Sequence, residues 1–382
     1  MRKTLLFLLV VLLILTSCST VSTKGRTLEI SFRNGGEEVS HVTLKGKIGF
    51  EMPRDPVREG FSFTGWWIIT DEAVALFSEE WLRENVDTVP DEVVVNARWI
   101  NTACKVEYAF MSNYVQDGAV YNDLLFKFNS SGKGSVYSME RQNKVGVVQL
   151  DKVDLIKPHA NCVFFGNARY DAADELPVLY SNVYTSYSGS MDRREGTLCA
   201  YRITGGPSSY SGELVQVIKI GFKDDKDLWR SHAIGDRSPY GNFLLDYDNN
   251  KLWAFVTRDY NRTTRFFCFD MPDLSAGVYD GTYGVNVVTL EAGDIIDMFD
   301  VPYSFYLQGA CYHEGKIYST EGMGTDINPC SIRVIDLEKK IEDYAIDLTG
   351  RGIANEAELI DFWGGYFWYG DAQSKVFRIT GL

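Results

Sequence analysis

The sequence is short of the residues that build metal centres. It contains 4 histidines and 7 cysteines in 382 residues, and no two cysteines form a C-x-x-C pair. The histidines at positions 41, 159, 232 and 313 lack the short spacings of zinc ligands. We therefore expect no metal site, and no motif indicates an organic cofactor.

Basic residues are also scarce. Lysine and arginine number 38 against 52 aspartates and glutamates, which gives a formal net charge of −14. This balance argues against a nucleic-acid partner and against electrostatic adhesion to an anionic membrane surface. Aromatic residues, in contrast, make up 14% of the chain, with 22 Tyr and 22 Phe. Such a content favours a protein made mostly of β-strands.

The first residues have the form of an export signal. Arg2 and Lys3 precede an apolar run from Leu5 to Leu15, which is shorter than the roughly 20 residues of a membrane-spanning helix. The run leads into Leu15-Thr16-Ser17-Cys18, which resembles the lipobox of bacterial lipoproteins. The resemblance implies that residues 1–17 are a signal peptide and that Cys18 is acylated on its sulfur after export.

The remaining chain is then expected outside the cytoplasm, on the cell membrane or the outer membrane. Residues 18–25 are small and polar, so they are predicted to be a lipidated tether. The membrane is thus the first expected partner, reached through the lipid rather than through charge. The alternatives are an uncleaved membrane helix and an ordinary secretory peptide that ends near a cysteine by chance.

The other cysteines stand in apolar strand patterns. Export permits disulfides, but Cys199 in LCAYRI and Cys268 in FFCFDM look like ordinary core residues. We expect most of this set to be buried free thiols: Cys104, Cys162, Cys199, Cys268, Cys311 and Cys330.

Residues 26–101 carry a specific pattern. Leu28 to Phe32 alternates like a strand and leads to the turn residues Asn34-Gly35-Gly36. The spaced residues from Pro53 to Trp66 read P-x-x-P-x-R-E-G-F-x-F-x-G-W, and a strand ending in Ala97-Arg98-Trp99 closes the segment. The pattern resembles the Listeria–Bacteroides repeat, or internalin B-repeat. The resemblance implies a small β-grasp-like module of the kind that serves bacterial surface proteins as a spacer or adhesion element.

This module departs from the family pattern between residues 71 and 91. The stretch SEEWLRENV within it predicts a short helix. Phe61, Phe63, Trp66 and Trp99 are expected in the core, although Trp66 and Trp67 together form an alternative glycan-stacking platform. Nothing in the module looks catalytic.

Residues 103–382 contain a loose repeat with uneven spacing. The clearest pair is QGACYHEGKIYSTEG (308–322) and ELIDFWGGYFWYGD (358–371), and five units fit the region. The strands that follow also align with one another: VGVVQL (145–150), LCAYRI (198–203), FFCFDM (266–271), IRVIDL (332–337) and VFRITG (376–381). Five small sheets around an axis predict a five-bladed β-propeller, with Lys105 to Met111 as a strand that closes the ring against the last unit. The unit also resembles the propeller of some teichoic-acid-associated and phage receptor-binding proteins. A β-sandwich and a six-bladed ring are the alternatives.

The repeat places one residue of each unit at the start of the innermost strand. In a propeller these positions meet at one mouth of the central channel, where ligands commonly bind. Strict spacing favours Phe243 over Asn242 in the third unit, but the polar residue suits a mouth better. The predicted ligand-binding residues are Gln116, His159, Asn242, Gln308 and Glu358.

Binding without catalysis is the expected function, with a polysaccharide or a cell-surface protein as the ligand. The alternative is a polysaccharide-active hydrolase or lyase that uses the channel mouth. A glycosidase needs two carboxylates about 5 to 10 Å apart, yet Glu358 is the single acid among the aligned mouth positions. A lyase would need a base such as His159, with Arg169 or Arg230 nearby to neutralise a uronate. No catalytic residue is therefore assigned.

Overall fold

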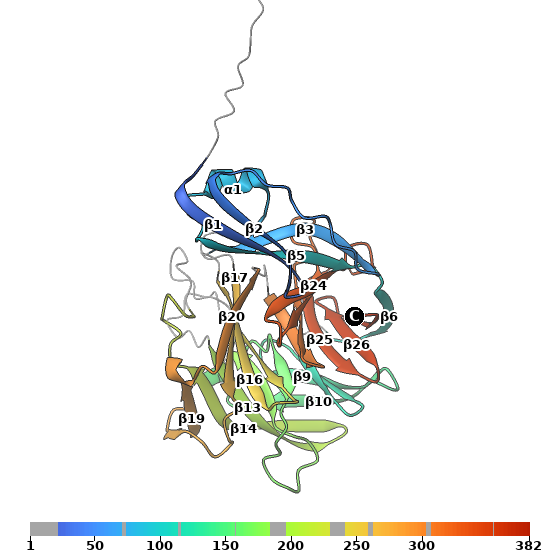
Figure 1. The fold of residues 1–382 in the computed structure, drawn as a ribbon. Helices are drawn as coiled ribbons and strands as arrows, with labels where there is room; N and C mark the ends of the chain where they lie inside the picture. The colour runs from blue at the N-terminus through green and yellow to red at the C-terminus, as the bar shows by residue number, and fades with distance from the viewer. Residues whose placement is uncertain are drawn as a thin grey trace, which may run out of the picture.

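The protein is mostly β-strand and has two parts, a small module and a larger propeller-like ring of sheets (Figure 1). The structure is a computed structural model, and it describes residues 22–70, 74–113, 116–156, 158–183, 196–229, 241–258, 263–302, 307–353 and 355–382. Cys18 and the signal peptide lie outside these residues, so the predicted lipidation site has no structural account here.

The module is a mixed sheet in the order β2-β1-β5-β3-β4, in which β1 and β5 run parallel. A single helix, α1, packs with Leu82 facing the core, and Ser78 caps it by accepting a hydrogen bond from the Trp81 amide at 3.0 Å. The helix lies within the predicted SEEWLRENV stretch and confirms it. The elements are β1 (Ser22–Asn34), β2 (Glu37–Lys47), β3 (Phe61–Ile69), β4 (Val74–Leu76), α1 (Glu79–Asn85) and β5 (Glu92–Asn101).

Strand β1 begins earlier than the sequence indicates. Ser22 already pairs with Lys47, and the buried Thr23 hydroxyl donates to the Arg26 carbonyl and accepts from the Gly46 amide. The described end of the predicted tether, residues 22–25, is therefore part of the module. At the far end of β1 the turn to β2 uses Gly35 and Gly36 at φ values of 61° and 90°, a conformation that favours glycine.

The ring is built from successive antiparallel units, which we number 1 to 5. Units 1 and 2 belong to one larger sheet, because their last strands, β10 and β14, pair in parallel. Unit 1 contains β7 (Gly118–Tyr121), β8 (Leu124–Phe128), β9 (Lys133–Ser138) and β10 (Asn143–Leu150), and unit 2 contains β11 (Val163–Phe165), β12 (Leu179–Val183), β13 (Thr197–Gly206) and β14 (Ser209–Ile220).

The other units follow the same order, from an inner strand outward. Unit 3 contains β15 (Gly241–Asp246), β16 (Lys251–Arg258), β17 (Thr263–Asp270) and β20 (Asp297–Pro302). Unit 4 contains β21 (Leu307–His313), β22 (Lys316–Glu321), β23 (Ser331–Asp336) and β24 (Ile341–Asp347). Unit 5 contains β25 (Ala357–Trp363), β26 (Tyr366–Asp371), β27 (Lys375–Thr380) and β6 (Lys105–Met111).

Two short elements and a hairpin fill the connections. Helix α2 (Val153–Ile156) links units 1 and 2, and the 3₁₀ turn η1 (Ala292–Asp294) precedes β20. The hairpin of β18 (Val278–Asp280) and β19 (Val285–Leu290) extends unit 2, because β19 pairs in parallel with β14. The stretch DYDNNK, which has calcium-loop-like acids, is the hairpin turn between β15 and β16, where Asp246 accepts from the Asp248 and Asn249 amides.

Strand β6 closes the ring, as the sequence predicts. It pairs antiparallel with β27, from Lys105 opposite Thr380 to Met111 opposite Lys375. An apolar cluster fills each seam between neighbouring units, including the seam between units 5 and 1, where Leu359 and Trp368 meet Leu125 and Tyr137. The cluster between units 4 and 5 is continuous with the core of the module. Burial of these clusters is the main force that holds the units around one axis.

One finer sequence prediction needs correction, and the expected core position of Trp66 is confirmed. The segment VGVVQL, aligned with the third strands of the other units, is β10, the fourth strand of unit 1, and the third strand is β9. Trp66 is 3% exposed and packs against Phe32 and Phe63, so it cannot share a glycan platform with Trp67. The expectation of buried free thiols is confirmed for all members of the set: Cys104, Cys162, Cys199, Cys268, Cys311 and Cys330.

The module and the ring share one sheet and a buried ion network. Strand β5 pairs with β24 where Ile100 meets Ala345, and beside this contact Arg98 Nε donates to Glu342 Oε1 at 2.8 Å. Arg333 of β23 binds the other oxygen of Glu342. Burial alone would raise the pKa of Glu342, but the charges of Arg333 and Arg98 outweigh it and lower the pKa to about 2.

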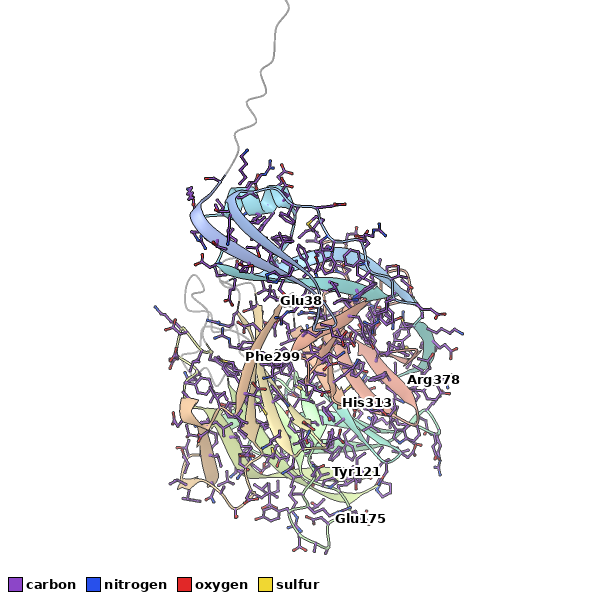
Figure 2. All side chains as sticks on the ribbon, in the orientation of Figure 1. Glu38, Tyr121, Glu175, Phe299, His313 and Arg378 are labelled. Carbon is purple, nitrogen blue, oxygen red and sulfur yellow. The ribbon has the colours of Figure 1, made fainter. Side chains whose placement is uncertain are left out.

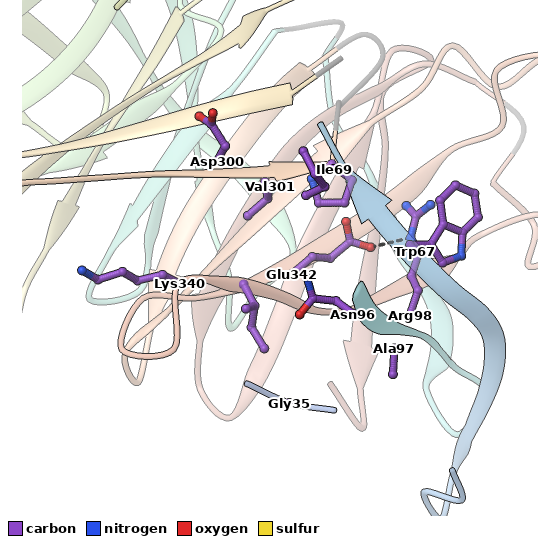
Figure 3. A pocket seen from close by; sticks show the side chains of 12 residues that line it. Gly35, Trp67, Ile69, Asn96, Ala97, Arg98, Asp300, Val301, Lys340 and Glu342 are labelled. Carbon is purple, nitrogen blue, oxygen red and sulfur yellow. Dashed lines mark hydrogen bonds and ion pairs between the residues drawn. The ribbon is translucent and has the colours of Figure 1, made fainter. Parts of the chain in front are cut away.

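A small cavity of about 60 Å³ opens beside this network, between the two parts of the molecule. Figure 3 shows Trp67 next to Arg98, whose guanidinium carbon lies 4.9 Å from the centre of the indole ring. Trp67 is therefore engaged by an arginine of its own module at the contact with unit 4. Trp67 is thus not available as a free aromatic platform on the module surface.

Neutralising Glu342 should destabilise the protein strongly. Glu342→Gln keeps the shape but removes the carboxylate that lies between Arg98 and Arg333, and among the described residues only Glu321, 4.0 Å from Arg333, remains as an anion nearby. Breaking a buried pair in this way costs about 3 to 5 kcal/mol of unfolding free energy.

The matched control is Glu107→Gln, because Glu107 pairs with Arg378 on the exposed face of unit 5. This variant should lose less than about 1 kcal/mol of unfolding free energy. Urea unfolding of both variants measures the difference, and equal losses would contradict the role of the network.

Candidate functional site at the ring axis

The predicted mouth residues do converge, but they bond to one another. Gln116 Nε2 donates to Glu358 Oε1 at 3.2 Å across the seam between units 1 and 5. Asn242 Nδ2 donates to the Gln308 carbonyl at 2.5 Å, and Gln308 Nε2 donates to Glu356 Oε1 at 2.5 Å. Glu358 and Asn242 are at most 1% exposed, so this end of the axis is a packed polar layer.

Residues that the sequence analysis missed complete this layer. Asp117 Oδ2 accepts from the Val163 amide at 2.8 Å, which joins units 1 and 2. Asn182 donates to Asn242 Oδ1 at 2.8 Å and accepts from the Cys162 amide at 2.9 Å. Asp117 directly precedes β7, and Asn182 lies within β12. Their hydrogen-bond partners include residues of neighbouring units, so the local sequence does not indicate that these two side chains belong to the polar layer.

The inner strands approach one another closely at this level. A Cβ placed on Gly309 of β21 would lie 2.2 Å from the Glu358 carbonyl oxygen and 2.9 Å from Asp117 Oδ1. Only glycine fits between these two oxygens, which come from units 5 and 1. The axis is therefore filled at the level of these two oxygens by backbone and carboxyl groups, and the partly exposed side chains beside this level are His159 and Glu356.

His159 lies just before β11, and burial lowers its pKa to about 4. Its imidazole is therefore neutral at ordinary pH and can accept or donate a hydrogen bond without carrying charge. The other four predicted residues take part in the hydrogen bonds of the polar layer. They are Gln116, Asn242, Gln308 and Glu358.

Buried carboxyl groups gather where units 5 and 1 meet. Burial raises the pKa of Glu358 well above its ordinary value, and the nearby charges of Glu356 and Asp117 raise it further. Burial likewise raises the pKa of Asp117. Lys127, also buried, has its pKa lowered to about 8 by burial although Asp371, Asp117 and Glu358 surround it. One oxygen of Glu358 and one of Asp117 have no hydrogen-bond partner in the protein.

The axis has a second layer, formed by thiols, a phenol and a carboxyl group. The Cys162 thiol donates to the Phe243 carbonyl at 2.8 Å. Burial raises the pKa values of Cys162, Cys311 and Tyr247 well above their ordinary values, and the negative charge of Asp361 adds to each shift. These groups are neutral and poorly nucleophilic at pH 7, so covalent catalysis through a thiolate is not favoured here.

Comparison with known proteins gives little guidance. No protein-family model matches the sequence, and no curated protein matches it. A crystal structure of Myxococcus xanthus glutaminyl cyclase is similar over 72% of this chain and 94% of that chain, at 12% sequence identity and a TM-score of 0.40. The computationally designed protein Ika8 is similar over 75% of this chain and 77% of that chain, at 10% identity and a TM-score of 0.28. Likenesses this weak carry no argument about activity.

Two further properties of the described residues bear on the site. No group of three or more His, Cys, Asp or Glu side chains among them could hold a metal ion. No helix in the same part of the chain is long and apolar enough to cross a membrane.

The raised pKa of Glu358 should make stability depend on pH. The folded state keeps the proton that the unfolded chain has lost, so stability falls as pH rises above the ordinary glutamate pKa. Glu358→Gln removes this loss of stability. The unfolding free energy of the variant relative to wild type should therefore increase by up to about 1.4 kcal/mol per pH unit between about pH 5 and pH 7. Urea unfolding at both pH values tests this. The exposed Glu314→Gln is the control, and a Glu358→Gln difference that does not change with pH would contradict the expectation.

Proposed function

We propose that this protein is a lipid-anchored bacterial lipoprotein whose units 1 to 5 are the blades of a five-bladed β-propeller that binds a glycan or protein partner without catalysis. The module is proposed to be a Listeria–Bacteroides repeat that joins the propeller to the anchor. The observation that carries the proposal is the convergence of side chains from the inner strands on one axis, seen in the contacts of Gln116, Cys162, Asn242, Gln308 and Glu358.

Burial of the carboxyl groups supports binding over hydrolysis. A glycosidase needs two carboxylates that reach the sugar from opposite sides. Glu358 is 1% exposed and Asp117 is 0% exposed, and both are fixed by neighbouring strands. A substrate cannot contact side chains that are enclosed to this degree, so these acids support a rigid scaffold rather than turnover.

One observation favours the alternative of a polysaccharide-active hydrolase or lyase. Glu356 lies at the same end of the axis, is less buried than Glu358, and accepts a hydrogen bond from Gln308. Burial raises its pKa above the ordinary value, although the bond from Gln308 opposes the shift. A carboxyl group whose pKa is raised is better suited to act as a general acid than an ordinary glutamate.

A glycan array with the full chain tests the proposed binding function. We expect wild type to bind a cell-envelope polysaccharide, and Gln308→Ala with His159→Ala to bind it about tenfold more weakly, which corresponds to about 1.4 kcal/mol. Incubation with polyuronides and teichoic acids should release no product. Unchanged binding by a folded double variant would refute the mouth as the site, and turnover that Glu356→Gln abolishes would establish the enzyme instead.

Replacing Cys18 tests the proposed anchor. Wild type should partition into the detergent phase and carry acyl chains on Cys18, because two or three chains hold a protein stably on a membrane. Cys18→Ser should leave the protein unlipidated and release it from membranes. Mass spectrometry of the N-terminal peptide checks both forms, and an unmodified Cys18 in a protein that stays in the cytoplasm would contradict the lipoprotein assignment.

A further inference from the structure

Unit 2 carries an insertion that distinguishes it from the other units. Residues 166–178 connect its inner strand β11 to β12, whereas turns of two to four residues make this connection in units 1, 3, 4 and 5. Glu175 of the insertion and Tyr121 of unit 1 lie at the end of the ring that is far from the module (Figure 2). Loops that extend a regular scaffold commonly carry binding residues, so we searched this insertion for a site.

The insertion is held in a fixed shape by hydrogen bonds. The Gly166 amide donates to the Val178 carbonyl at 2.7 Å, and the Val178 amide donates to the Ala168 carbonyl at 2.9 Å. Arg202 of β13 donates to the Asp174 carboxylate through Nε and, at 2.7 Å, through Nη2. A segment that is already ordered loses little conformational freedom when a ligand binds to it.

An open hollow of about 350 Å³ lies between the insertion and unit 3. It is lined by residues 167–170 of the insertion, Tyr180 of β12, Asn250 of the turn between β15 and β16, and residues 271–275, which follow β17. This volume is at the lower end of the range for small-molecule sites. The hollow can therefore hold a ligand of the size of one or two sugar rings.

The hydroxyl of Tyr180 has no hydrogen bond within the part of the chain that the structure describes. Tyr180 is 2% exposed, and its ring stacks on Phe164 with 5.1 Å between the ring centres. A Cβ on Gly166 would lie 2.7 Å from Cε2 of the same ring, so the ring position is fixed from a second direction. Burial alone raises the pKa of the hydroxyl, which stays protonated. Buried hydroxyls ordinarily have a partner, and a ligand in the hollow would supply one.

Two side chains of the hollow are placed to donate to a ligand. Asn167 Nδ2 donates to Asn250 Oδ1 at 3.2 Å, which leaves the Nδ2 group of Asn250 as a donor. Arg169 is exposed, and its guanidinium donates to the Tyr121 hydroxyl at 3.2 Å. Among the described residues, no carboxylate forms an ion pair with Arg169. A guanidinium binds a carboxylate through two parallel hydrogen bonds, so Arg169 favours a ligand that carries one.

The remaining lining is a mixture of apolar and polar groups. Tyr170 is 50% exposed, with the Arg202 guanidinium carbon 5.3 Å from its ring centre, and the partly buried Leu274 adds apolar surface. Asp273 and Ser275 are exposed and can accept hydrogen bonds. A sugar ring presents apolar C–H faces together with hydroxyls that donate and accept, so it matches this lining. The net charge of −14 disfavours a partner with many negative charges, such as a strongly acidic peptide.

We propose that this hollow binds a uronate, a sugar residue that carries a carboxylate, with Arg169 as the counter-charge, Tyr170 against the sugar ring, and Tyr180 and Asn250 bonded to its hydroxyls. The hollow lies at the opposite end of the inner strands from the mouth residues, so the inference goes beyond the proposed function and does not depend on it.

The same placement bears on the lyase alternative. His159 precedes β11 and Arg169 follows it, so this base and this arginine lie at opposite ends of the strand. Arg230 lies outside the described residues. The hollow therefore binds the uronate without a base to cleave it.

Calorimetric titration of the full chain with 1,4-linked digalacturonate, diglucuronate and dimannuronate tests the proposal. The matched neutral ligands are the corresponding disaccharides of galactose, glucose and mannose. We expect at least one diuronate to bind at least about tenfold more tightly than its neutral counterpart, because only the carboxylate pairs with the guanidinium. The proposal is overturned if no diuronate binds, if the neutral sugars bind equally well, or if an acetylated peptide ending in glutamate binds as tightly.

Variants locate the site. Arg169→Gln should weaken diuronate binding about tenfold, whereas Arg141→Gln, at an exposed arginine between β9 and β10, should change it less than about twofold. Tyr180→Phe removes a hydroxyl that stabilises no contact of the described protein, so it should leave thermal stability unchanged and weaken binding about fivefold. Wild-type affinity in either the Arg169 or the Tyr180 variant would overturn the assignment.

The variant with both Gln308→Ala and His159→Ala separates this hollow from the mouth. It should bind the diuronate as wild type does. If it loses diuronate binding while Arg169→Gln retains it, the proposed mouth site stands and the inference about the hollow is wrong. If Arg169→Gln loses diuronate binding and no glycan depends on the mouth residues, the hollow stands and the proposed mouth site is wrong.

Discussion

The pairing of β6 with β27 is the contact on which the rest of the structure depends. It joins a strand near the start of the ring to the last strand of the chain, and it supplies the fourth strand of unit 5. Phe110 of β6 also belongs to the apolar cluster between units 5 and 1. Gln116 and Glu358 meet only across that seam, so the polar layer at the axis exists because this pairing closes the ring.

The module is tied to the ring by the same stretch of chain. Strand β5 ends at Asn101, and only a few residues separate it from β6. Motif residues of the module face the ring rather than solvent: Arg58 pairs with Asp343 at 2.9 Å and lies over the Phe61 ring, which packs against Tyr344. The residues that resemble a surface repeat therefore serve here to fix the module against unit 4.

Much of this architecture can be predicted from the sequence, because strands and turns leave local patterns of residues. Alternating apolar residues located most strands, and KVEYAFM was identified as the closing strand because the last unit lacked one. The repeat spacing also placed Gln116, Gln308 and Glu358 at one level of the axis. The third strand of unit 1 was misplaced because VGVVQL has the same alternation as the true third strands, and only pairing with β9 and β14 distinguishes it.

The side-chain contacts could not be predicted from the sequence. Glu342 and Arg98 stand 244 positions apart, and nothing in either segment signals that they meet. Asp117 and Asn182 have polar partners in neighbouring units, and those partners depend on how the units rotate about the axis. The same rotation decides whether a mouth residue faces solvent or another side chain, so the sequence spacing could not indicate that Asn242 and Glu358 are buried.

Closure by an early strand also sets the order of events when the chain is made. β6 ends at Met111 and its partner β27 ends at Thr380, so the ring cannot close until all five units have been made. Until then β6 and the inner face of unit 1 have no lasting partners, and the nascent ring stays open.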